Sequence, residues 1–321
     1  RGMEKPRLVV GKGSKAGFRT VQAAVDAAPE SGGAVIAIGP GEYREKLFVG
    51  KPGLRLEGAG RDRTVLRWDD AAEKPFGDGT KTGTFRSYAA YFGGDDFEAA
   101  DLSVVNGAGR GPGVGQAIAA YVDSRRARFS RCAFRGRQDT LFLGPLPPRP
   151  RVPGSFVGPG ESGPRILKAH RFEDCLVEGD VDFIFGSAAA LFLRCEIRSL
   201  RLPPGMKGYV TASSSPEGAA LGLCFLDCGL SGDAEPGSVF LGRPWRPHAQ
   251  AAFLYCSLGA HIAPRGWSDW EEPSDRGSVG FVEGGSAGPG AGTDSRAAWA
   301  SVLGESETEA FARSLLASFG A

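Results

Sequence analysis

The sequence predicts an all-β solenoid of the parallel β-helix type, and three observations support this fold class. The 49 glycines and 22 prolines are spread along the 321 residues, which is typical of many turns between short strands. The apolar segments are short, and no helical segments alternate with them, which argues against a βαβ sheet or a TIM barrel. A short unit that ends in cysteine recurs along the chain, and such recurrence indicates stacked coils.

The recurring unit places a cysteine a few residues after a phenylalanine or a leucine. Its copies are Phe-Ser-Arg-Cys132, Phe-Glu-Asp-Cys175, Phe-Leu-Arg-Cys195, Phe-Leu-Asp-Cys228 and Leu-Tyr-Cys256. The six cysteines form no CxxC pair and the chain has three histidines, which argues against a zinc site. Because free cysteine packs as a small hydrophobe, we expect inward-facing core thiols. A disulfide scaffold is the less favoured alternative, since a core of this size does not need one.

Strands are expected at short apolar segments that are bounded by Gly, Asp or Pro. These segments are residues 34–38, 54–57, 117–121 and 190–193. A solenoid needs capped ends, and a helix from Phe18 to Ala28, stopped by Pro29, is predicted to cap the first coil.

A second helix is predicted from Glu307 to Phe319, with Ser306 and Glu309 as its capping-box pair. Its apolar face is formed by Phe311, Leu315 and Phe319. We expect this helix to close the other end of the solenoid. Because no linker divides the chain, residues 1–321 are predicted to form a single domain.

One stretch, Pro145 to Pro164, breaks the rhythm of the coils, since it is rich in Pro and Gly and has no periodicity. It lies between two segments that carry candidate catalytic carboxylates. It is either an inert surface insertion or a loop that borders a cleft, because long ordered loops near a site often shape it.

Charge and hydropathy exclude several classes of protein. The formal net charge is +1 and no Lys/Arg stripe follows a helix face, so nucleic acid is not an expected partner. No apolar run approaches about 18 residues, so no membrane span is expected. The segment Arg1–Leu8 is charged and no apolar stretch follows it, so a signal peptide either was removed or never existed.

Three short segments each carry one group that could do chemistry: Asp139, Asp182 and Arg243. The segments are Gly136–Phe142, Gly179–Gly186 and Leu241–Trp245. A buried charge is tolerated only when it is paired and hydrogen-bonded. Two carboxylates whose environments push their pKa values apart can supply an acid and a nucleophile. An arginine beside a carboxylate keeps it ionised and orients it by a bidentate bond.

The neighbours of these groups also have functional and structural interpretations. On a strand, Val181 and Phe183 would face away from Asp182, which puts the carboxylate on the outer face. Side-chain amides such as those of Gln116 and Gln138 are donors for a developing oxyanion, or they are satisfied polar groups at coil corners. Trp245 suits a sugar ring on an open groove; alternatively it packs on a coil corner while Arg243 makes a weak surface ion pair.

The segment Gly284–Gly288 matches the G-x-S-x-G pattern of serine hydrolases. That pattern requires a strand before it and a helix after it, whereas Pro-Gly-Ala-Gly follows here. Only His170, His248 and His261 are available as a base, so a Ser-His-Asp mechanism is disfavoured.

Taken with their order, the three segments resemble the signature regions of the pectin methylesterases. Further similarity lies at Phe18–Val25, at Asn106–Gly109 before Gly115-Gln116-Ala117, and at His261–Trp267. The resemblance extends from about Phe18 to Trp299. It implies a right-handed parallel β-helix and the hydrolysis of galacturonate C6 methyl esters in pectin to methanol and polygalacturonate.

The resemblance also implies roles for the candidate residues. Asp182 is the nucleophile, and Asp139 is the general acid that protonates the leaving methanol and then the base that activates water. Gln116 and Gln138 stabilise the oxyanion, and Arg243 binds Asp182. We expect Arg243 to depress the pKa of Asp182, and burial together with the Asp182 charge to raise the pKa of Asp139.

Trp245 is expected to pack against the sugar, with Val181 and Trp267 helping to shape the groove. The implied substrate is methylesterified homogalacturonan, and no metal or cofactor is required. A monomer is expected. A cell-wall polymer as substrate implies secretion, and the chain carries no long inhibitory pro-region, which favours a bacterial-type member.

Two residues, Arg137 and Asp180, depart from the family pattern, which leaves the reaction unchanged and puts substrate preference in doubt. Other functions on the same fold are weighed against the esterase. A polygalacturonate lyase would use clustered carboxylates for calcium, and a glycoside hydrolase would place carboxylates around a glycosidic oxygen. An acyl-thioesterase or a carbohydrate-binding solenoid would be expected to lose part of the Gln, Asp and Arg set, which this chain retains.

Overall fold

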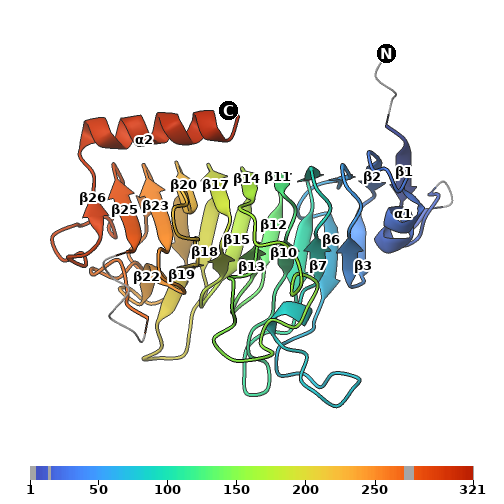
Figure 1. The fold of residues 1–321 in the computed structure, drawn as a ribbon, viewed down its shortest axis with the longest axis horizontal. Coiled ribbons are helices and arrows are strands. Elements are labelled where there is room, and N and C mark those ends of the chain that lie inside the picture. Colours follow the sequence, from blue (N-terminus) through green and yellow to red (C-terminus); the bar gives the residue numbers. More distant parts are fainter. Residues whose placement is uncertain (1–4, 14–15, 271–277, 321) are drawn as a thin grey trace.

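The computed structural model describes residues 5–13, 16–270 and 278–320, and these form a right-handed parallel β-helix. Each coil contributes strands to three parallel sheets, and the coils stack in chain order from β1 to β26 (Figure 1). Residues 1–4, at the start of the segment considered for a signal peptide, lie outside the described residues. In the described chain, no helix is long and apolar enough to cross a membrane.

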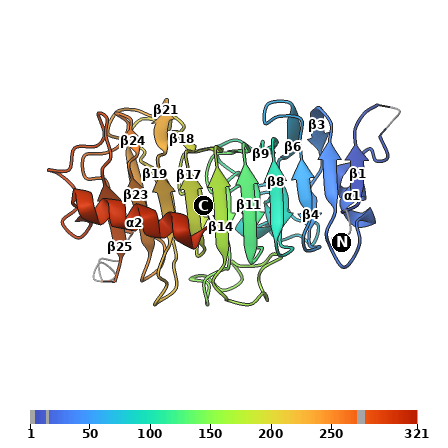
Figure 2. The same ribbon diagram turned by 90° about the horizontal axis from the view of Figure 1, so that it is seen from above.

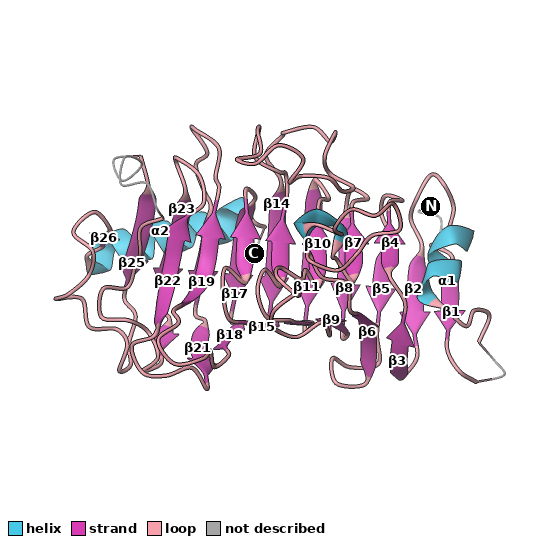
Figure 3. Ribbon diagram, turned by 90° about the horizontal axis from the view of Figure 1, so that it is seen from below, coloured by secondary structure: helices cyan, strands magenta, loops and turns pink. Residues whose placement is uncertain are grey.

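The three sheets are named A, B and C. Sheet A contains β1 (Arg7–Val10), β2 (Val35–Ile38), β5 (Arg55–Glu57), β8 (Phe97–Ala100), β11 (Arg126–Ser130), β14 (Ala169–Glu173), β17 (Ala189–Leu193), β20 (Leu223–Leu226), β23 (Gln250–Leu254), β25 (Gly280–Gly284) and β26 (Ser301–Val302). Sheet B contains β3 (Gly41–Arg44), β6 (Thr64–Trp68), β9 (Ser103–Asn106), β12 (Ala133–Arg135), β15 (Leu176–Gly179), β18 (Glu196–Ser199), β21 (Gly229–Gly232) and β24 (Ser257–Leu258). Sheet C contains β4 (Leu47–Val49), β7 (Ala90–Phe92), β10 (Ala120–Val122), β13 (Leu141–Leu143), β16 (Ile184–Gly186), β19 (Gly208–Ser213) and β22 (Val239–Pro244); β4, β7, β10, β19 and β22 are labelled in Figure 3. A short 3₁₀ helix, η1 (Thr84–Arg86), precedes β7.

The predicted strands agree with β2, β5 and β17, but the segment 117–121 is shortened to β10. Residues 116–119 approach the neighbouring coil through single hydrogen bonds before regular pairing begins. The N–H of Ala117 donates to the carbonyl of Gln138 at 3.1 Å, and that of Ala119 to Thr140 at 2.8 Å. The irregular entry is what carries Gln116 to the edge of sheet C.

Helix α1 (Val21–Ala27) is shorter than predicted at its N-terminal end because Phe18 still belongs to the first coil, where it bridges Val10. The hydroxyl of Thr20 accepts from the N–H of Ala23 at 3.2 Å and caps the helix. The helix contacts β1, β2 and β4, and it therefore closes the N-terminal end of the solenoid as expected.

Helix α2 (Glu305–Ser318) differs from the prediction in its start, its cap and its place. The Ser306–Glu309 capping box is wrong, because Gly304 is the N-cap and its N–H donates to Glu307 Oε2 at 3.0 Å. Leu315 packs with Leu191 and Leu254 on the outer face of sheet A. The helix lies along the side of the last coils and does not cap their end (Figures 1 and 2).

The interior contains a stack of phenylalanine rings, one from each successive coil of sheet A. The rings of Phe129, Phe172, Phe192, Phe225 and Phe253 are parallel, with centroids 4.9, 4.6, 4.6 and 4.3 Å apart. Offset aromatic contacts of this kind add to the free energy gained by burying the rings. The core is therefore a column that runs along the solenoid axis.

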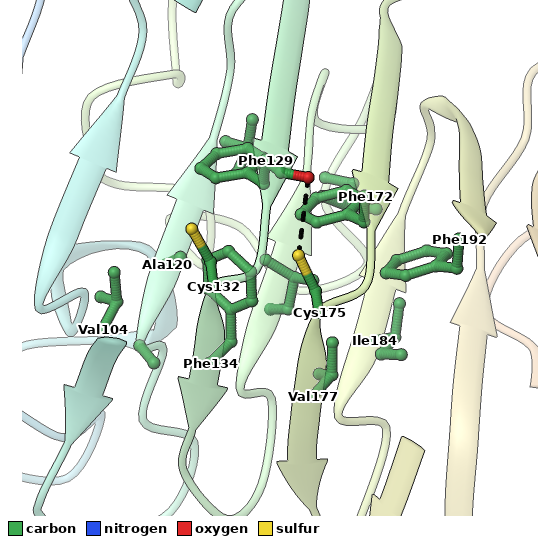
Figure 4. Packing of buried hydrophobic residues seen from close by; sticks show 14 of the residues in the cluster. Val104, Ala120, Phe129, Cys132, Phe134, Phe172, Cys175, Val177, Ile184 and Phe192 are labelled. Carbon is green, nitrogen blue, oxygen red and sulfur yellow. Dashed lines mark hydrogen bonds between the residues drawn. The ribbon is translucent and has the colours of Figure 1, made fainter. Parts of the chain in front are cut away.

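A ladder of cysteines lies beside the ring column, and Figure 4 shows its first two members, Cys132 and Cys175. All six cysteines are buried and unpaired. The prediction of inward-facing core thiols is confirmed for the five ladder members, whereas it is wrong for Cys224, which packs on the outer face of sheet A beneath α2. The residue before each ladder cysteine has a left-handed backbone, with φ between 51° and 53°: Arg131, Asp174, Arg194, Asp227 and Tyr255. The same corner is thus repeated coil after coil.

Candidate active site

One pocket of about 230 Å³ lies on the outer surface of sheet C, at the turns that precede its strands. It brings together most of the residues that the sequence marked as catalytic or binding: Gln116, Gln138, Asp139, Asp182, Arg243 and Trp245. These residues come from four coils that are far apart in sequence. The parallel stacking of β10, β13, β16, β19 and β22 places them side by side.

Asp139 and Asp182 occupy the same position in consecutive coils. Each precedes its strand by two residues, and Leu141 of β13 pairs with Ile184 of β16. The N–H of Asp139 donates to the carbonyl of Val181 at 3.0 Å, which joins the two corners directly. The fold therefore stacks the two carboxylates by simple repetition of one coil geometry.

Both carboxylates sit in left-handed backbone, with φ of 64° at Asp139 and 49° at Asp182. The expectation that Asp182 lies on a strand is wrong, because it occupies a turn just before β16. Asp tolerates this conformation better than most residues do, and the same backbone recurs at other coil corners, such as Arg131 and Asp174. The turn directs the carboxylate outward while Phe183 enters the core.

Arg243, on β22, holds Asp182 through two parallel hydrogen bonds. Its Nε donates to Oδ1 at 2.8 Å and its Nη2 donates to Oδ2 at 2.6 Å. The guanidinium lies over the rings of Tyr209 and Trp270, each with its centroid 3.9 Å away. A bidentate pair between two rings fixes the orientation of the carboxylate.

The pKa values of the two carboxyl groups are both raised, but unequally. Burial raises the pKa of Asp182 above its ordinary value although Arg243 opposes the shift, so the expected depression of this pKa is wrong. Burial and the charge of Asp182 raise the pKa of Asp139 well above its ordinary value. Loss of water outweighs the arginine at Asp182, whereas Asp139 has no such partner among the described residues. When the two carboxyl groups share one proton, it therefore resides on Asp139 and leaves Asp182 ionised, as an acid–nucleophile pair requires.

The amides of Gln116 and Gln138 both line the pocket. Within residues 5–13, 16–270 and 278–320, neither side-chain amide donates to another protein group. Their N–H groups are therefore free to donate to a bound ligand, which is what oxyanion stabilisation requires.

Asp180 is a third buried carboxylate at this site that sequence reasoning flagged only as a departure. Its side chain is fully buried, Oδ2 lies 2.9 Å from Arg137 Nε, and Oδ1 accepts from Arg110 Nη1 at 3.3 Å. Oδ1 also accepts from the N–H of Val181 at 2.7 Å. The two departures, Arg137 and Asp180, thus pair with each other, and they precede Asp139 and Asp182 by the same two residues.

Two of the predicted groove residues do not line the pocket with their side chains. Val181 is buried and serves the site through its backbone. Trp267 is fully buried, its Nε1 donates to Glu283 at 2.9 Å, and it stacks on Phe281. Direct contact between Trp267 and a sugar is therefore excluded by its burial in the core, and Trp270 lines the pocket instead.

The insertion predicted as either inert or cleft-bordering forms one wall of the pocket. Its pocket-lining residues are Arg151, Val152, Ser155 and Phe156. Phe156 is buried edge-on against Phe85, with centroids 5.5 Å apart, and it also meets Trp245. The guanidinium of Arg165 donates to four carbonyls of the same loop, which holds it closed on itself. The cleft-bordering interpretation is the one that the structure supports.

The serine motif is structural. Ser286 follows β25, and its hydroxyl accepts from the N–H of Cys256 at 3.2 Å. His170, His248 and His261 are all absent from the pocket lining, so the described residues assemble no Ser-His-Asp triad there.

Comparison with known proteins identifies the family of the chain. The pectinesterase family model matches residues 7–145 and 167–317. Among curated relatives, "Probable pectinesterase 8" of Arabidopsis thaliana is 34% identical over 94% of this chain and 72% of its own length. "Pectinesterase 31" of the same plant is 31% identical over 96% of this chain and 92% of its own length.

Solved structures give the same result. A pectin methylesterase from carrot superposes with a TM-score of 0.80 at 28% identity, covering 95% of this chain and 90% of its own. Pectin methylesterase PemA from Erwinia chrysanthemi gives 0.78 at 26% identity, covering 96% of each chain. A pectin methylesterase solved in complex with a hexasaccharide also gives 0.78 at 26% identity, covering 96% of each chain. The chain therefore belongs to the pectinesterase family, and with it to the carboxylic ester hydrolases.

Proposed function

We propose that this protein hydrolyses the C6 methyl esters of galacturonate units in pectin, with Asp182 as nucleophile and Asp139 as general acid and base. One observation carries the proposal. Asp139 and Asp182 are stacked in one pocket, and, of these two carboxylates, Asp182 alone is held by an arginine of the described chain. That asymmetry supports proton transfer by the more basic carboxyl group, Asp139, and attack by the fixed carboxylate, Asp182.

In the first half of the reaction, an oxygen of Asp182 attacks the ester carbonyl carbon. The carbonyl oxygen becomes an oxyanion that accepts from the amides of Gln116 and Gln138. The tetrahedral species collapses as the bond to the methoxy group breaks, and Asp139 gives its proton to that leaving group. Methanol departs, and the galacturonate acyl group is joined to Asp182.

In the second half, the ionised Asp139 takes a proton from a water molecule. The resulting hydroxide attacks the acyl carbon, the bond to Asp182 breaks, and the free galacturonate acid is released. Asp182 regains its carboxylate beside Arg243, and Asp139 is protonated again. The sum is one ester and one water converted to one acid and one methanol, with no cofactor in the scheme.

The pocket has the composition expected for a sugar polymer. Aromatic rings and donors combine in the pocket, with the rings of Trp245 and Phe185 5.7 Å apart between centroids. A relative of this fold binds a hexasaccharide, which supports methylesterified homogalacturonan as the substrate. Because that polymer lies outside cells, we propose that the protein is secreted. We further propose that it acts as a monomer and binds neither nucleic acid nor membranes. Assignment to the bacterial type stays a prediction.

The test is methanol release from highly esterified pectin by the parent and by Asp182→Asn. We expect the variant to fold and to lose at least about 10⁴-fold in rate, the scale seen when a nucleophile is removed. An active Asp182→Asn enzyme would overturn the nucleophile. A parent that releases no methanol but shortens the polymer, or forms unsaturated products, would replace the esterase with a chain-cleaving enzyme.

A further inference from the structure

Two arginines besides Arg243 line the pocket, and both are on the side of the insertion. Arg151 belongs to the insertion, and its guanidinium carbon lies 5.7 Å from the centroid of Trp270. Arg246 follows β22 and lies over Trp245 at 4.7 Å. Its Nη1 donates to the carbonyl of Trp245 at 2.9 Å and its Nη2 donates to that of Arg149 at 3.3 Å, which orients the group.

These two charges lack a counter-charge in the part of the chain that the structure describes. Arg243 has Asp182, but no described carboxylate lies within ion-pair distance of Arg151 or Arg246. Burial and the nearby charge of Arg151 lower the pKa of Arg246 to about 10, so the two cations are close enough to repel. Arg246 is half-buried and Arg151 is exposed, and two like charges held this close together favour an anionic ligand.

We infer that Arg151 and Arg246 form a subsite for the free carboxylate of a galacturonate unit next to the methyl ester under attack. The inference rests on the proposed function and concerns which esters are chosen. A planar guanidinium matches a carboxylate through two parallel hydrogen bonds, whereas a neutral methyl ester offers only its carbonyl. The subsite therefore favours esters that adjoin units already hydrolysed.

The position of the pair relative to the nucleophile supports this assignment. The guanidinium carbon of Arg243 lies 3.9 Å from the centroid of Trp270 and that of Arg151 lies 5.7 Å from it, so the proposed subsite and the arginine that holds Asp182 adjoin the same aromatic side chain. Arg151 also comes from the stretch between residues 145 and 167, which the family model does not match. The insertion thus supplies Arg151, whereas Arg246 lies in the region that the family model matches.

The first experiment compares kcat/KM for methanol release from fully esterified and from partly de-esterified galacturonan of equal length. The parent should prefer the partly de-esterified polymer. Arg151→Gln and Arg246→Gln should each lose about tenfold on that polymer and little on the fully esterified one, as expected for one charge-assisted contact. Arg149→Gln is the matched control, because it removes the same charge from the same loop and its side chain does not line the pocket.

Equal losses of kcat/KM in all three variants would show general electrostatic attraction and would overturn the subsite. A parent enzyme that does not prefer the partly de-esterified polymer would overturn it as well. A second experiment measures binding of fully de-esterified oligogalacturonate by calorimetry, which does not depend on catalysis. The Kd should rise about tenfold in Arg151→Gln and Arg246→Gln and stay constant in Arg149→Gln. An unchanged Kd in the pocket variants overturns the subsite even if the esterase is active. Arginine-dependent binding in a chain that releases no methanol would retain the subsite and reject the proposed function.

Discussion

In the interior, Phe172 lies over Phe129 and Phe192 lies over Phe172, with centroids 4.9 and 4.6 Å apart, because each coil repeats the residue of the last. Next to the pocket residues Asp139 and Asp182, equivalent positions of consecutive coils carry different groups, such as Arg137 beside Asp180. The backbone is the same in both regions. Repetition spreads stability over many equal contacts, whereas the departures from repetition concentrate charge at one place. Stability and activity should therefore respond to different substitutions.

The largest effect that tests this separation is expected from Asp139→Asn. Loss of the general acid should lower kcat by about 10²–10⁴-fold. Stability should not fall, because the raised pKa of Asp139 means that its ionisation opposes folding as pH rises through that pKa. Methanol release and thermal unfolding at neutral and mildly alkaline pH measure both. A variant that melts well below the parent would show that the pocket also carries stability.

The interior counterpart is Phe192→Ala. Removing a fully buried ring from the column should cost about 3–5 kcal/mol in the free energy of unfolding, from lost burial and the cavity left behind. The folded fraction should keep its kcat, because Phe192 does not line the pocket. Urea denaturation and methanol release on the same samples check this, with Phe192→Leu as the milder control. A large loss of kcat in folded Phe192→Ala would contradict the separation.

Asp180→Asn probes the boundary between the two regions. It removes a buried charge from Arg110 and Arg137, and the half-exposed arginines should limit the loss to about 1–3 kcal/mol. The negative charge of Asp180 also contributes to the raised pKa of Asp139. Its removal lowers that pKa, so the alkaline limb of the pH–rate profile of the Asp139–Asp182 pair should move to lower pH. A profile that does not move would make Asp180 purely structural.

The smallest effect is expected from Cys195→Ala in the thiol ladder. The thiol donates to the carbonyl of Phe172 at 3.5 Å, and its loss should cost about 1 kcal/mol, a typical value for a mild core change. Because the cysteines are unpaired, a reducing agent should leave the melting temperature of the parent unchanged. A melting temperature that falls with reductant would point to a disulfide.

The repeating part of the molecule was predictable from sequence because repetition is itself a sequence signal. The repeated units that end in Cys132 and Cys175 predicted both the stacked coils and the side chains that face the interior. The catalytic residues were found through short segments with unusual charges and through family resemblance. Asp182 was nevertheless assigned to a strand, because alternation with Phe183 does not distinguish a strand from a left-handed corner.

The remaining errors concern residues whose place is set by contacts between coils. Trp267 and Trp270 differ by three residues, and only packing decides which enters the core and which lines the pocket. The pairing of Arg137 with Asp180 could have been predicted by aligning the two signature segments at Asp139 and Asp182, because Arg137 and Asp180 then occupy the same position. Whether the pKa of Asp182 is raised or lowered depends on how deeply its carboxyl group is buried, which a sequence does not give. The same holds for Arg151, since nothing in the insertion's composition fixes where it folds.

The last strand of the solenoid, β26, is only two residues long, and the chain then turns back along the side of the coils as α2. A β-helix with open ends offers ladders of unpaired N–H and C=O groups on which a second molecule could add its own coil. Here α1 contacts the strands of the first coils, and β26 offers a ladder of two residues at the other end of sheet A. Head-to-tail growth into filaments is thereby opposed at both ends, which would let a protein with so long a parallel sheet remain dispersed at high concentration.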